Sequence, residues 1–214
     1  MAKKTEEEGF SLNRMKRGLC LALCLTLCLG FFGCGSASKE DPAEIFDVVL
    51  WGPYIDEDSV RPKIEAMLAE IPELKGQTIR VTTVSTGDPD KLDATVYAAN
   101  AMRLTAMASC GEVDVAIMST DSAQRAARGD LFIPLSELFT ESELEAYDGR
   151  LLDYTQEDVT GQDEGTRTPI CGIDVSRSSY WSSLLPQDGY GVYAVTDIGP
   201  EGMTKAVIQY LAGL

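Results

Sequence analysis

The stretch that decides the fold is GEVDVAIMSTDSAQRAARGDLFIPLSEL, residues 111–138. Its apolar run at 113–118 predicts a buried strand, and the small-residue run at 122–128 predicts a helix. Three polar residues stand between the two: Ser119, Thr120 and Asp121. Side chains of this kind can cap the helix that follows, and they can also contact a ligand.

The same alternation of strand and helix occurs upstream. Strand-like runs at 45–51 and 78–84 are each followed by apolar residues at helical spacing, at about 60–71 and 92–109. The wide apolar coverage of 92–109 predicts a largely buried helix. Repeated strand–helix units with short connections predict an α/β fold: a three-layer sandwich with a mostly parallel sheet flanked by helices.

Beyond residue 135 the pattern is less regular, although we still expect one α/β domain over 45–214. The elements expected here, in order, are a helix at 136–147, a surface loop at 153–167, a strand at 168–175, a short helix at 179–185, a strand at 191–196 and an amphipathic helix at 203–214.

The N-terminal region predicts export. A basic start at 15–17 precedes an apolar run at 18–32, which at about 15 residues is shorter than the roughly 20 that a transmembrane helix needs. These features are typical of a signal segment, here 1–33. Residues 1–14 look like an extension upstream of the natural start, because an acidic run does not suit the head of a signal.

Cys34 directly follows a small residue, Gly33, at the end of the apolar run. This arrangement resembles the lipobox of bacterial lipoproteins, which implies that Cys34 is lipidated and that 34–44 is a polar tether. Several acyl chains would hold the protein stably at a membrane. An ordinary cleaved signal and an uncleaved anchor are the alternatives.

Composition narrows the partners and the chemistry. The chain has a net charge of −16, and because residues 1–33 hold five basic and three acidic residues, the remainder would carry −18. Such an acidic surface disfavours nucleic acid and anionic lipid headgroups. With no histidine, Ser-His-Asp and Cys-His mechanisms and the common zinc sites are excluded. Carboxylate or lysine chemistry stays open, and a hydrolase that uses acidic residues is the catalytic alternative. We predict no metal, no cofactor and a binding rather than a catalytic role.

Two cysteines remain beyond the signal and the predicted anchor residue, Cys110 and Cys171. In an oxidising compartment they could form a disulfide, and two free thiols are the alternative.

Ligands of open parallel sheets bind beyond the carboxyl ends of the strands. Aromatic rings, hydroxyls and a carboxylate there would suit a small solute. The candidate ligand-binding residues are Trp51, Tyr54, Ser85, Thr86, Ser119, Thr120, Asp121 and Trp181. As alternatives, the polar residues cap helices and the tryptophans pack against the sheet.

The passage from 111 to 138, with its RGDLFIPLSEL ending, is similar to the first lobe of extracellular solute-binding proteins of ABC importers. The resemblance implies one lobe of a type 2 periplasmic-binding-protein fold, with 140–167 standing where a second lobe would be inserted. It also implies a bacterial lipoprotein on the outer face of the cell membrane that binds a sugar, amino acid or peptide for transport or sensing, with a membrane permease as partner. A surface or scaffold lipoprotein that contacts another protein is the alternative.

Overall fold

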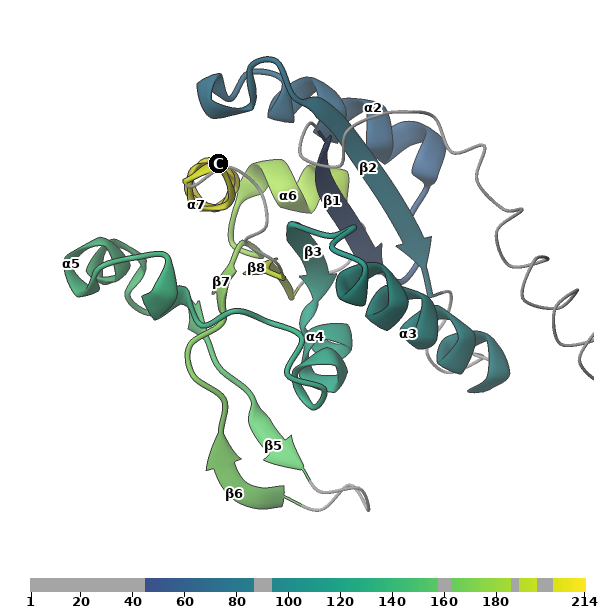
Figure 1. Cartoon of the computed structure of the whole chain (residues 1–214), viewed down its shortest axis with the longest axis vertical. Helices are drawn as coiled ribbons and strands as arrows, with labels where there is room; N and C mark the ends of the chain where they lie inside the picture. The colour runs from purple at the N-terminus through teal and green to yellow at the C-terminus, as the bar shows by residue number, and fades with distance from the viewer. Residues whose placement is uncertain (1–44, 87–93, 158–162, 186–188, 196–201) are drawn as a thin grey trace, which may run out of the picture. The chain divides into compact units, whose positions relative to one another are not determined.

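The computed structural model describes residues 45–86, 94–157, 163–185, 189–195 and 202–214. The predicted signal segment, the tether and the lipidation site Cys34 lie outside these residues. A six-stranded sheet forms the centre of the domain in the order β2-β1-β3-β8-β7-β4, with helices on its two faces (Figure 1). The predicted α/β class is therefore confirmed.

Three strands make the parallel half of the sheet: β1 (Ile45–Gly52), β2 (Thr78–Ser85) and β3 (Val115–Ser119). β1 lies between the other two and pairs parallel with both. All residues of β1 after the first are buried, because both faces of this strand are covered. The sequence predicted all three strands, and they carry the carboxyl ends on which the candidate site depends.

The other half of the sheet is antiparallel, so the prediction of a mostly parallel sheet is wrong. β8 (Tyr190–Ala194), β7 (Gly172–Asp174) and β4 (Leu151–Leu152) supply three of the five strand pairings, all antiparallel. These strands belong to the irregular part of the sequence. Parallel pairing requires a long crossover for every strand, and no regular strand–helix repeat continues beyond residue 135 to supply one.

The segment predicted as a surface loop contains a two-stranded hairpin instead, formed by β5 (Thr155–Glu157) and β6 (Asp163–Arg167). Its strands are short and polar, so an apolar pattern could not reveal them. The predicted helix at 136–147 is likewise broken into single turns: η3 (Leu135–Glu137), α5 (Glu141–Leu144) and η4 (Glu145–Tyr147).

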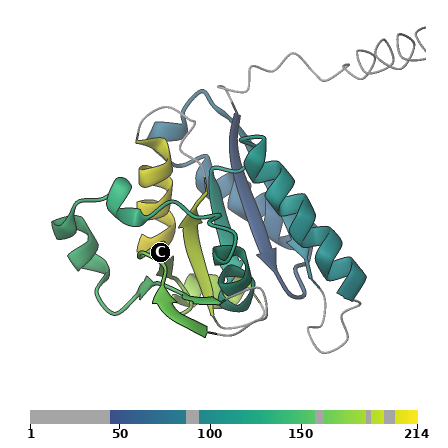
Figure 2. The same cartoon turned by 60° about the horizontal axis from the view of Figure 1, so that its bottom comes forward.

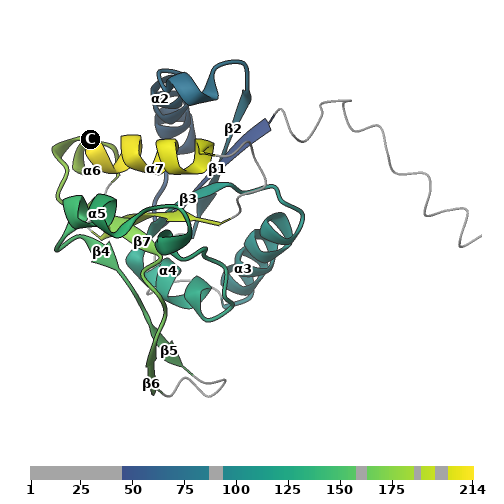
Figure 3. The same cartoon turned by 60° about the vertical axis from the view of Figure 1, so that its left-hand side comes forward.

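The helices cover two unequal faces of the sheet (Figure 3). α2 (Glu57–Leu68), α6 (Ser179–Leu184) and α7 (Met203–Gly213) lie on one face, together with the short turn η2 (Pro72–Leu74). This side, with 26 buried apolar residues that include Leu50 and Ile117, is the packed face. α3 (Ala94–Ser109) and α4 (Thr120–Ala127) lie on the opposite side, which is the open face.

Among the residues that the structure describes, 13 are buried on the open face, including Trp51, Leu104 and Met118. Successive residues of a strand point to opposite faces, so Leu50 enters the packed face and Trp51 enters the open face. Half as many buried residues cover the same sheet on this side. The open face is therefore where the domain has room for something else.

Helix α3 is mostly exposed, so the prediction that it would be largely buried is wrong. Among its described side chains only Leu104 is buried, while Val96 is 52% and Met102 is 73% exposed. Figure 2 shows α3 beside β1, with no other described element on its outer side. An apolar composition favoured burial, but only one side of the helix has protein to pack against. None of the helices in the described part of the chain is both long and apolar enough to span a lipid bilayer.

Two buried carboxylates connect the strands at the amino end of the parallel half. Both oxygens of Asp47 accept hydrogen bonds from the Arg80 guanidinium, and the Asp47 amide donates to Asp114 Oδ2 at 2.7 Å. Burial raises the pKa of Asp47, and the Arg80 contacts oppose that rise. These groups hold β1, β2 and β3 in register at the end of the sheet remote from the predicted ligand site.

Candidate functional site

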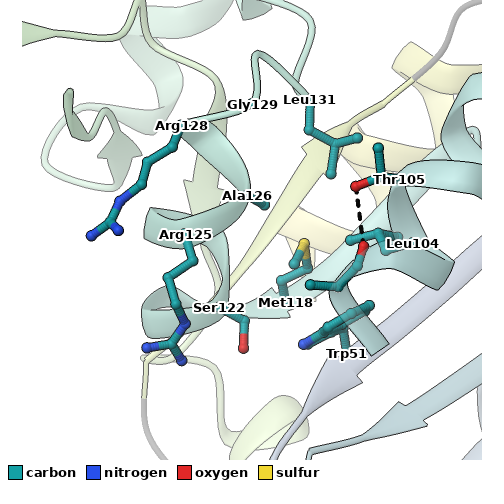
Figure 4. Close-up of a pocket in the computed structure, with 11 residues that line it drawn as sticks. Trp51, Leu104, Thr105, Met118, Ser122, Arg125, Ala126, Arg128, Gly129 and Leu131 are labelled. Carbon is teal, nitrogen blue, oxygen red and sulfur yellow. Dashed lines mark hydrogen bonds between the residues drawn. The ribbon is translucent and has the colours of Figure 1, made fainter. Parts of the chain in front are cut away.

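A pocket of about 330 Å³ lies on the open face between α3 and α4 (Figure 4). Its floor is buried and its rim is exposed. The floor includes Trp51, Leu104, Met118 and Ser122, and the rim includes Thr105, Arg125, Arg128 and Gly129. Ala101, Ala126 and Leu131 complete the lining. The volume is at the lower end of the roughly 300–1,000 Å³ typical of ligand pockets, so any ligand must be small.

Sheet register and small helical residues together create this pocket. Trp51 of β1 pairs with Met118 of β3, so both side chains rise side by side from the sheet. α4 covers them with a surface of alanines, including Ala123 and Ala126. Among the described side chains of α3, Leu104 is the one that is buried here. Small residues on α4 and this one leucine leave space between the described parts of the two helices.

The indole N–H of Trp51 has no hydrogen-bond partner among the described residues, although the side chain is only 2% exposed. Leaving a buried donor unpaired costs about 1–3 kcal/mol. In Figure 4 the nitrogen points toward the Ser122 side of the pocket rather than into the apolar wall. The protein thus presents a buried donor to the pocket, and an acceptor from outside would satisfy it.

Ser122 is held in place by Ser119, the last residue of β3. Ser119 stands at the N-cap position of α4, but its hydroxyl donates to Ser122 Oγ at 2.9 Å and makes no capping bond. Thr120 and Asp121 are the first residues of the helix itself, so the interpretation that they cap it is wrong. The Thr120 amide donates instead to the carbonyl of Gly189 at 2.7 Å.

The remaining candidate residues do not gather in this pocket. Ser85 is exposed and Thr86 buried at the end of β2, where the Thr86 amide donates to the Gly52 carbonyl at 2.9 Å. Tyr54 has a positive φ of 53° and lines a separate hollow of about 220 Å³ with residues of α2 and α6.

Trp181 lies on the packed face, remote from Trp51 in the fold. It is 1% exposed, and its indole N–H donates to the Leu211 carbonyl at 3.0 Å. The structure therefore joins α6 to α7 through Trp181. Of the eight predicted residues only Trp51 lines the pocket on the open face, and Ser119 contacts it indirectly through its hydrogen bond to the lining residue Ser122.

The sequence analysis missed most of the lining, including Leu104, Thr105, Ser122 and Arg125. These residues lie on helices, not at strand ends, and their common feature is that α3 and α4 face each other across the open face. No local pattern records that arrangement.

The described cysteines do not form the disulfide that the sequence allowed. Cys110 is exposed at the end of α3, Cys171 is buried, and both are free thiols. Burial raises the pKa of Cys171 to about 11. Within the described ranges, no group of three or more His, Cys, Asp or Glu side chains could hold a metal ion.

Neither a protein-family model, nor a curated protein, nor a solved structure matches this chain.

Proposed function

We propose that this protein is an exported, lipid-anchored solute-binding module that holds a small solute in the pocket between α3 and α4. The observation that carries the proposal is the unpartnered indole N–H of Trp51, buried at the floor of a ligand-sized pocket. The lobe-like resemblance of residues 111–138 supports it further. The solute class offered by that resemblance is a sugar, an amino acid or a peptide, bound for transport or sensing.

Binding rather than catalysis suits the side chains that line the hollows. Glycoside hydrolysis by acidic residues needs a pair of carboxyl groups that flank the bond to be broken. Among the described residues, the pocket between α3 and α4 has no carboxyl group in its lining, and each of two smaller hollows has one, Asp130 or Asp56. Asp47 is bound to Arg80 at the other end of the strands.

A thermal-shift screen of the chain from Ser36 onward, against sugars, amino acids and short peptides, tests the proposal. A ligand at about 100 times its dissociation constant adds roughly 2.7 kcal/mol to the free energy of unfolding. The shift should disappear in Trp51→Phe, which removes the N–H at the pocket floor. It should persist in Trp181→Phe, which removes the matching group on the packed face.

The membrane anchor has its own test. Lipidation at Cys34 predicts incorporation of a labelled fatty acid by the full chain in a bacterial host, and Cys34→Ala should abolish it. Incorporation that survives in Cys34→Ala would reject Cys34 as the anchor while leaving solute binding untouched.

The second candidate, a scaffold that contacts another protein, is favoured by one observation. α3 exposes an almost uncharged outer surface that includes Val96 and Met102, and Arg103 is its one charged side chain. Exposed apolar patches commonly mark protein contacts. If no solute shifts the melting temperature, and Met102→Ser reduces capture of a partner from the same cell surface, the scaffold function replaces the solute-binding one.

A further inference from the structure

The polar groups along the Trp51 edge of the pocket between α3 and α4 can all donate hydrogen bonds to a ligand. The Trp51 indole offers an N–H and cannot accept, and the same is true of an arginine guanidinium. The Ser122 hydroxyl already accepts from Ser119, so its own proton is what it can offer a ligand. Figure 4 shows the Trp51 nitrogen, the Ser122 hydroxyl and the Arg125 guanidinium along the same edge of the pocket, whereas the Arg128 guanidinium points away.

The charged residues that line the pocket also favour a ligand group that carries negative charge. Two arginines and no acidic residue are among the described residues that line the pocket, in a chain with 34 acidic and 18 basic residues. Arg125 also interacts elsewhere in the chain, but a guanidinium has five N–H donors and can serve two partners at once. A ligand group that only accepts hydrogen bonds and carries negative charge fits this edge best.

The opposite wall is apolar. Leu104, Met118 and Leu131 supply it, with Ala101 and Ala126 between them. The hydroxyl of Thr105 donates to the Ala101 carbonyl at 3.0 Å, so its proton is used within α3. An apolar cavity of about 150 Å³ is enough for benzene. A pocket of about 330 Å³ therefore accommodates one ring, or a short branched chain, together with a polar group.

We infer that the solute is a small carboxylate with an apolar body, its carboxylate accepting from Trp51 Nε1, Ser122 Oγ and Arg125. This inference rests on the proposed solute-binding function and narrows it: free sugars, whose neutral hydroxyls accept weaker hydrogen bonds than a carboxylate does, are disfavoured. Within the classes proposed above, it favours acids with an aromatic or aliphatic side chain.

The test is a titration of the full-length chain in detergent micelles with phenylacetate and with phenylacetamide, its neutral isostere. Trp181→Phe leaves Trp51 as the single tryptophan, so its fluorescence reports the pocket directly. Charge-assisted hydrogen bonds are about twice as strong as neutral ones, and we expect phenylacetate to bind at least about tenfold more tightly than phenylacetamide. Should Trp181→Phe fail to fold, the thermal shift of the unsubstituted chain follows the same titration.

Two arginine variants separate the site from general charge. Arg125→Gln should weaken phenylacetate about tenfold and leave phenylacetamide unchanged. Arg103→Gln removes the same charge from exposed α3 outside the pocket and should leave both affinities unchanged. Equal weakening by the two variants would overturn the contact with Arg125.

The other outcomes distinguish this inference from the function on which it rests. Equal affinities for the acid and the amide would overturn the carboxylate class but keep solute binding. If a sugar changes the Trp51 fluorescence and phenylacetate does not, the carboxylate class is likewise overturned and solute binding is kept. If no compound of any class changes the fluorescence or the melting temperature, both proposals fail.

Discussion

The two faces of the sheet share the same strands but differ in how completely they are covered. Among the described residues, the packed face has 26 buried apolar residues from the sheet, α2, α6, α7 and the turns and loops beside them, and the open face has 13 buried residues. The tryptophan of each face shows the difference: the indole N–H of Trp181 donates to Leu211, while that of Trp51 has no partner among the described residues. One face supplies most of the stability, which leaves the other able to contain a pocket.

The largest expected effect comes from replacing one leucine on each face. Leu68 of α2 is fully buried, and Leu68→Ala should lower the free energy of unfolding by about 2–5 kcal/mol. Leu104 of α3 borders the pocket and has fewer neighbouring atoms to lose, so Leu104→Ala should cost less, about 1–2 kcal/mol. Urea denaturation measures both. Equal losses would show that the open face is as tightly packed as the other.

The second test probes how tightly the packed face is filled. A Cβ added at Gly52 would overlap the Tyr190 hydroxyl, which is buried without a partner among the described residues. Gly52→Ala should therefore cost about 1–3 kcal/mol. Tyr190→Phe removes the unpaired hydroxyl, so on its own it should be nearly neutral. It leaves two ring carbons at 2.7 and 2.8 Å from the position of the added Cβ.

The double variant, Gly52→Ala with Tyr190→Phe, should recover only part of the stability that Gly52→Ala loses, because the ring carbons of residue 190 still crowd the added Cβ, as a double-mutant cycle by denaturation would show. Strictly additive effects would mean that the Tyr190 hydroxyl does not limit the space at Gly52.

The parallel and antiparallel halves of the sheet differ in how far the sequence could predict them. β1, β2, β3 and the helices between them follow from apolar periodicity, which a single sequence records directly. The antiparallel half follows only in part: the strands expected at 168–175 and 191–196 contain β7 and overlap β8, but β4, with two residues, is too short for a pattern. Their strand pairing depends on backbone hydrogen bonds to distant partners.

The pocket shows the same limit. Trp51 was predicted at a strand end, but Ser122 and Leu104 matter only because α4 and α3 lie opposite each other. The expected burial of α3 failed for a related reason: composition records how apolar a helix is, and not how much protein surrounds it. Val96 and Met102 are as apolar as core residues and yet are exposed.

The third test uses the buried thiol of the open face. The pKa of Cys171 is raised by burial from 9.0 to about 11, so the folded protein retains a proton that the unfolded chain loses. Stability should fall as the pH rises from 9 toward 11, and the share of Cys171 at pH 10 is about 1 kcal/mol. Cys171→Ala should remove that share from the pH dependence measured by denaturation.

Peptide-resolved labelling with a maleimide at pH 8 provides an independent measurement, because the thiolate is the reactive form. Exposed Cys110 should react rapidly and buried Cys171 only in denaturant. Rapid labelling of Cys171 in the folded protein would mean that this part of the open face opens readily.

The smallest effect is expected on the outer surface of α3. Met102 is 73% exposed, so Met102→Ser should change the free energy of unfolding by no more than about 0.5 kcal/mol. Leu104→Ala, two positions along the same helix, is its matched contrast, since that side chain points inward. Denaturation at several protein concentrations is the measurement. A loss above 1 kcal/mol that grows with concentration would show that a second copy covers α3 in solution, and the open face would then owe part of its stability to association.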